Sequence, residues 1–111
     1  MASITISIKG RDWNFILLTD RRFDKLHNED GGSRAGMTSP NQYECHFRKS
    51  DWCISDIRHE LGHALFHMSL TGSSDLTPDQ TEETMCEIIA HHTPEIMLWS
   101  DRVAEKFFGR E

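Results

Sequence analysis

Two histidines and a glutamate stand within five residues of each other, in the segment His59-Glu60-Leu61-Gly62-His63. On an α-helix, positions i and i+4 share one face, so His59 and His63 can direct two imidazole nitrogens at one ion. Zinc is commonly bound by imidazole in this spacing. Glu60 is rotated by about 100° from His59, a position from which its carboxylate reaches a metal-bound water without binding the metal. The pattern predicts a zinc centre with Glu60 as general base.

Two histidines leave a tetrahedral zinc ion with room for a third protein ligand and a water, which is the open coordination that catalysis requires. Three downstream carboxylates can supply the ligand, those of Glu82, Glu83 and Glu87. Glu83 and Glu87 lie at i and i+4, so one can bind the metal while the other hydrogen-bonds a ligating histidine. Periodicity does not exclude Glu82, which falls within about 60° of the apolar Met85. The paired arrangement favours Glu83 as ligand.

The segment HELGH, followed after 19 residues by Glu83-Thr84-Met85-Cys86-Glu87, resembles the HExxH…ExxxD/E signature of the gluzincin metallopeptidases. Over roughly residues 53–92 the chain is similar to their smallest members, the minimal gluzincins and the ImmA/IrrE-like proteins of bacteria and phages. The resemblance implies a zincin fold in which His59 and His63 bind zinc and Glu60 is the base. It also implies Glu83 as third ligand and Glu87 as the acidic group that orients a ligating histidine.

The chain departs from related patterns at three positions. Ser69 stands where the metzincin extension HExxHxxGxxH has its third histidine, and Thr84 and Met85 replace the alanine and asparagine of the ImmA/IrrE pattern. No downstream residue clearly matches the histidine or tyrosine with which larger gluzincins stabilise the oxyanion. Zinc binding is therefore a firmer expectation than peptidase activity.

Five further side chains have a functional and a structural interpretation. Tyr43, His91 and His92 are candidates for contacting substrate or the oxyanion, but a strand tyrosine usually packs, and a histidine pair suits a helix C-terminus. His67 extends the i, i+4 series but lies about 80° from His59 around the helix, which favours a surface role. Cys86 lies near the glutamates, yet a lone helical cysteine is usually a small buried apolar residue.

The elements that position these residues begin with strands. Ile4, Ile6 and Ile8 alternate with polar residues, and residues 13–19 follow a short turn, so the sequence predicts a hairpin. Residues 43–48 alternate again and predict a third strand directly before the metal helix, at the edge of the sheet. Most of the sequence between these strands is predicted as loop, of which residues 29–41 could form a lid.

Three helices are expected after the strands. Apolar residues recur at helical spacing from Trp52 to Met68, and Thr77-Pro78-Asp79-Gln80 is a capping box that starts a second helix running to about His92. Thr93-Pro94 repeats the signal and predicts a third helix. Strands followed by helices indicate the α+β class. With the resemblance, we expect a zincin-like fold with a small twisted sheet, an active-site helix, a glutamate helix and a C-terminal helix.

Composition limits the remaining possibilities. The 111 residues suit a single domain over residues 1–111, and a net charge of −6 without a basic cluster argues against nucleic acid as a partner. No apolar run approaches the about 20 residues of a membrane span, and no secretory signal is visible, so we expect no membrane partner and a cytoplasmic location. Three cysteines without CxxC spacing suggest free thiols.

The expected function is zinc-dependent hydrolysis of peptide bonds in a protein or peptide substrate, bound as an extended strand at the sheet edge. One alternative is an interaction protein with a zincin fold, stabilised by zinc and catalytically weak or inactive, possibly from a phage or mobile element. Another is a hydrolase of a different bond that uses the same zinc-bound water.

Overall fold

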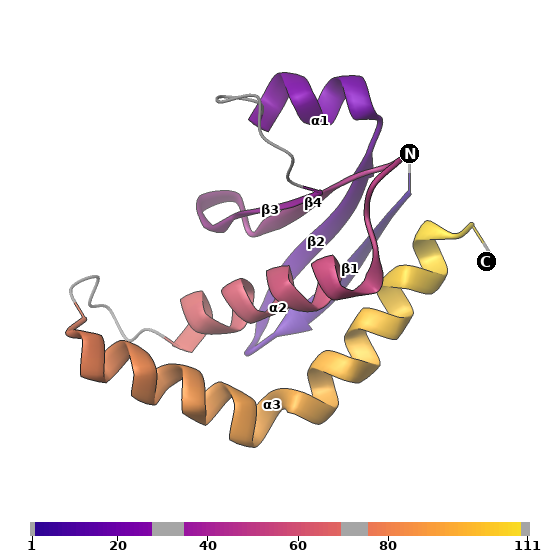
Figure 1. Ribbon diagram of the computed structural model, residues 1–111. Coiled ribbons are helices and arrows are strands. Elements are labelled where there is room, and N and C mark those ends of the chain that lie inside the picture. The colour runs from indigo at the N-terminus through magenta and orange to yellow at the C-terminus, as the bar shows by residue number, and fades with distance from the viewer. Residues whose placement is uncertain (1, 28–34, 70–75, 110–111) are drawn as a thin grey trace.

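The computed structural model describes residues 2–27, 35–69 and 76–109. The elements along the chain are β1 (Ser3–Ile8), β2 (Arg11–Leu18), α1 (Asp20–His27), β3 (Gly36–Ser39), a short 3₁₀ helix η1 (Pro40–Gln42), β4 (Glu44–Arg48), α2 (Ile54–Ser69) and α3 (Pro78–Phe107). The strands form one mixed sheet, with α1 on one face and α2 and α3 on the other (Figure 1). The α+β class predicted from the sequence is confirmed.

The sheet has the strand order β1-β2-β4-β3. β1 and β2 form the predicted hairpin, whose two-residue turn, Lys9-Gly10, has φ values of 51° and 82°. Positive φ at both positions gives a turn whose twist matches that of the flanking strands. β2 and β4 are parallel, whereas β3 and β4 are antiparallel.

The prediction that residues 43–48 form the edge strand is wrong. β4 lies between β2 and β3, so the edge next to α2 is β3. Parallel strands need a long crossover, and the crossover from β2 to β4 contains both α1 and β3, which then pairs with the open side of β4. The predicted lid at residues 29–41 is divided: residues 29–34 lie outside the described part of the chain, and Gly36–Ser39 form β3.

α1 is a helix of eight residues where the sequence predicts at most a helical turn. Its N-cap is Thr19, whose hydroxyl accepts a hydrogen bond from the backbone N–H of Arg22 at 3.2 Å. Phe23 is buried against the sheet, and Arg48 of β4 donates to the carboxylate of Asp24 at 2.9 Å. These contacts hold α1 on the face of the sheet opposite the predicted metal site.

α3 is one helix of 30 residues, not the two that the sequence predicts. Its predicted capping box is present, with the N–H of Gln80 donating to the hydroxyl of Thr77 at 3.1 Å. The predicted cap at Thr93 is wrong, because the Thr93 hydroxyl instead donates to the carbonyl of Ile89 at 2.5 Å, one turn earlier. Pro94 has no N–H for the helical ladder, and Figure 1 shows α3 changing direction in its middle.

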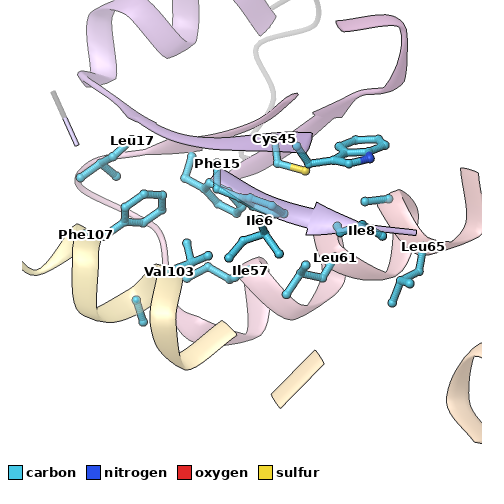
Figure 2. Close-up of a cluster of buried hydrophobic side chains, with 14 of the residues drawn as sticks. Ile6, Ile8, Phe15, Leu17, Cys45, Ile57, Leu61, Leu65, Val103 and Phe107 are labelled. Carbon is cyan, nitrogen blue, oxygen red and sulfur yellow. The ribbon is translucent and has the colours of Figure 1, made fainter. Parts of the chain in front are cut away.

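One apolar core fills the space between the sheet and the two long helices (Figure 2). Its members include Ile6, Ile8, Phe15, Phe47, Ile57, Leu61, Leu65, Val103 and Phe107. Burial of Ile57 and Leu61 fixes the rotation of α2 about its axis, because both side chains must face the sheet. The same rotation leaves His59 and His63 exposed.

Candidate metal centre

The two histidines of α2 are arranged as ligands of one ion. Nε2 of His59 and Nε2 of His63 are 3.2 Å apart, and the rings are steeply inclined to each other, at 78°. Two zinc–nitrogen bonds of about 2.0–2.1 Å at the tetrahedral angle separate the nitrogens by about 3.3–3.4 Å. The pair therefore fits a zinc ion bound through both Nε2 atoms.

Glu60 lies beside this pair and is almost fully buried, with 6% of its surface exposed. The hydroxyl of Thr38, on edge strand β3, donates to its Oε1 at 2.5 Å. Gly36, two residues earlier, also lies against Glu60: a Cβ at residue 36 would stand 3.1 Å from Glu60 Cγ and 3.2 Å from Oε2. β3 therefore approaches the carboxylate this closely only because residue 36 has no side chain.

An open groove of about 1010 Å³ joins these groups. One wall is β3 with the residue before it, and the other is the N-terminal half of α2 with Asp51. The lining residues are Ala35, Gly36, Met37, Thr38, Asp51, Ser55, Asp56, His59, Glu60 and His63. The predicted base and both predicted ligands thus share one groove with the edge strand of the sheet.

The predicted third ligand is not brought to this groove. A second cavity, of about 300 Å³, lies between α2 and α3, and there Thr81 and Met85 are the α3 residues that face the histidines. Glu82, Glu83 and Glu87 are all exposed. Glu83 is about 200° from Thr81 around the helix, whereas Glu82 is about 100° away. Within the described ranges, no three His, Cys, Asp or Glu side chains are grouped closely enough to hold a metal.

Glu87, expected to orient a ligating histidine, instead pairs with His91 one turn later, at 3.2 Å between Oε2 and Nε2. His92 pairs through Nδ1 with Glu95 at 2.6 Å. Both histidines lie within α3, because the helix does not end at His92. They line a separate cavity beside the β1–β2 turn and not the groove of the histidine pair. The structure does not bring them to the candidate site.

Tyr43 also lies away from the groove. It adopts a left-handed conformation with φ of 55° at the end of η1, and its ring packs edge-on against Trp13 with centroids 5.3 Å apart. His67 completes this cluster at 6.0 Å from each of the two rings, and the guanidinium of Arg11 lies 4.0 Å from the centre of the tyrosine ring. The packing interpretation of Tyr43 and His67 is the one that these contacts support.

Gly36 and Thr38 are site residues that sequence reasoning missed. They belong to a four-residue strand whose residues are all half-buried, so no alternation of apolar and polar residues marks it. The only signal is a small residue followed two positions later by a β-branched hydroxyl residue, which is too common to indicate a site.

Cys45 lies behind Glu60, opposite Thr38 in the β3–β4 ladder. Its Sγ is 3.6 Å from the Thr38 hydroxyl and 3.9 Å from the backbone carbonyl of Glu60. Burial raises the pKa of the Cys45 thiol to about 12, and the negative charge of Glu60 acts in the same direction. Cys45 is therefore a neutral packing residue at neutral pH, whereas the thiols of Cys53 and Cys86 are free and exposed.

We expect a thiol reagent to modify Cys53 and Cys86 in the native protein and Cys45 only after unfolding. The unfolded thiol ionises near pH 9 and the folded one near pH 12, so the contribution of Cys45 to folding stability should fall as the pH rises between these values. Chemical denaturation from pH 8 to 11 measures this loss, and Cys45→Ala should reduce it. Modification of Cys45 as fast as Cys53 in the native state would contradict its burial.

None of the helices in the described ranges is long and apolar enough to cross a membrane. Comparison of the chain with protein-family models, with curated proteins and with solved structures finds no match.

Proposed function

We propose that this protein is a zinc-dependent peptidase of the zincin type. The observation that carries the proposal is the distance of 3.2 Å between the two Nε2 atoms of His59 and His63, beside a buried glutamate, in a groove whose opposite wall is a sheet edge. A pair of imidazoles and a neighbouring carboxylate is the arrangement used to activate a zinc-bound water.

When bound, zinc would supply a water with a pKa near 7 and a Lewis acid for the substrate carbonyl. Glu60 accepts a proton from the attacking water and later donates it to the leaving amine. Since the Thr38 hydroxyl occupies Oε1, Oε2 is the oxygen available for this transfer. Burial of Glu60 keeps bulk water from competing for the carboxylate.

The substrate class follows from the shape of the groove. β3 is an edge strand along one wall, and an extended peptide can pair with it through backbone hydrogen bonds. Such pairing places a peptide bond alongside His59 and His63, which lie on the other wall. The proposed substrate is therefore an extended protein segment.

A second candidate function is that of a zinc-stabilised interaction protein with little or no catalysis. The observation that favours it is the position of Glu82, Glu83 and Glu87, none of which lines either cavity at the histidine pair. A site with only two protein ligands binds zinc more weakly than one with three. Glu83 as third ligand remains a prediction from the resemblance.

Peptide cleavage by the zinc-loaded protein distinguishes the two functions. We expect the protein to cut members of an unbiased peptide library, to lose this activity with a chelator, and to regain it when zinc is restored. Mass spectrometry of the products identifies the cut bonds. Stoichiometric zinc without cleavage of any library member would favour the interaction protein.

A further inference from the structure

The edge strand beside Glu60 has two sets of backbone groups that point in opposite directions. The backbone N–H of Arg48 donates to the carbonyl of Ala35 at 2.9 Å, and the β3–β4 register pairs Gly36 with Phe47. Hydrogen-bonded and non-hydrogen-bonded pairs alternate in an antiparallel ladder. Met37 and Ser39 therefore direct their N–H and C=O groups at β4, and Gly36 and Thr38 direct theirs at the open edge.

The same two residues contact Glu60 on the face of the sheet that α2 covers. Residues i and i+2 of a strand share a face, and here that face carries the Thr38 hydroxyl on Oε1 and the close approach of Gly36 to Oε2. Phe47 limits any retreat of the carboxylate, because a Cβ at residue 36 would also stand 3.3 Å from its ring. The position of Glu60 is thus set by β3.

We propose that Gly36 and Thr38 are positioning residues that couple substrate docking to the general base. A peptide strand that pairs with β3 would hydrogen-bond to the backbone of these two residues, whose opposite sides hold the Glu60 carboxylate. The register of the substrate and the position of Oε2 are then fixed by the same two residues. This inference rests on the proposed peptidase function.

Three variants test the coupling through kinetics of the zinc-loaded protein. Thr38→Val removes the hydroxyl at nearly constant volume and should lower kcat about 10- to 100-fold with KM changed less than about threefold, because the base loses its alignment. Thr38→Ser keeps the hydroxyl and should stay near the wild-type rate. Thr5→Val, at an exposed position of β1, is the matched control and should change neither constant.

Gly36→Ala tests the second half of the pair. The added methyl group cannot fit without moving Glu60, Phe47 or β3, so kcat should fall while the affinity for zinc stays within about twofold of the wild type. A wild-type kcat in both Gly36→Ala and Thr38→Val would overturn the inference.

A spectroscopic measurement separates this inference from the proposed function. The side-chain carboxyl carbon of Glu60, observed by ¹³C NMR in the zinc-loaded protein, should shift in Thr38→Val but keep its wild-type position in Thr38→Ser and Thr5→Val. An unshifted signal in Thr38→Val would overturn the contact whatever the activity. A shifted signal in a protein that cleaves no peptide would instead overturn the peptidase proposal, and with it the catalytic part of this inference.

Discussion

Glu60→Gln is expected to abolish peptide cleavage while leaving zinc binding and the fold intact. Glutamine has the shape of glutamate, and its amide oxygen can still accept the hydrogen bond from Thr38, so the buried side chain keeps its partner. The amide cannot accept a proton from water. We therefore expect a loss of at least about 10²- to 10⁴-fold in kcat, the usual contribution of general acid–base catalysis.

The matched control is Glu105→Gln, which makes the same chemical change at an exposed position of α3. It should cleave at the wild-type rate. Thermal unfolding and zinc content of the two variants show whether any loss comes from the fold or the metal. Cleavage of a validated substrate by Glu60→Gln at the wild-type rate would exclude Glu60 as the base.

Zinc binding is expected to be lost when either histidine of the pair is removed. His59→Ala and His63→Ala each delete one of the two nitrogens that stand 3.2 Å apart. Both side chains are exposed, so neither substitution should change the free energy of unfolding of the zinc-free protein by more than about 0.5 kcal/mol. Chelator competition should show a loss of zinc affinity of at least about 100-fold for each variant.

His91→Ala is the control for that experiment. This histidine is exposed on α3 and pairs with Glu87, away from the groove, so its removal should leave zinc affinity unchanged. Stoichiometric zinc in a double variant of His59 and His63 would show that the metal binds elsewhere.

Local signals in the sequence predict the hairpin and the helix starts with uneven success. Thr77 and Thr93 are both followed by proline, yet only Thr77 begins a helix. The difference lies three residues after each threonine, where Gln80 closes a capping box and Ile96 has no polar group to do so. The chain therefore continues through Pro94 as one bent helix, which a cap-and-proline rule alone does not predict.

The candidate site was predictable to the extent that it depends on one rigid element. The spacing of His59 and His63 fixes their separation because a helix has fixed geometry, and burial of Ile57 and Leu61 fixes which way they face. The third ligand depends on how α3 is rotated against α2, and α3 turns Thr81 and Met85 toward the histidines. That rotation is set by packing between distant segments.

The contribution of β3 could not be predicted for a related reason. The sequence predicts β4 as the strand next to the metal helix, but the edge position depends on the order of the strands in the sheet. Only that order brings Gly36 and Thr38 against Glu60.

Anomalous diffraction at the zinc absorption edge, from crystals of protein purified with one equivalent of zinc, tests the central claim most directly. We expect a single peak per chain, about 2.0–2.1 Å from Nε2 of both His59 and His63, on the side of the groove that Glu60 lines. The electron density around that peak would identify the remaining ligands. A zinc peak away from the two histidines, or none in crystals with stoichiometric zinc, would contradict the account.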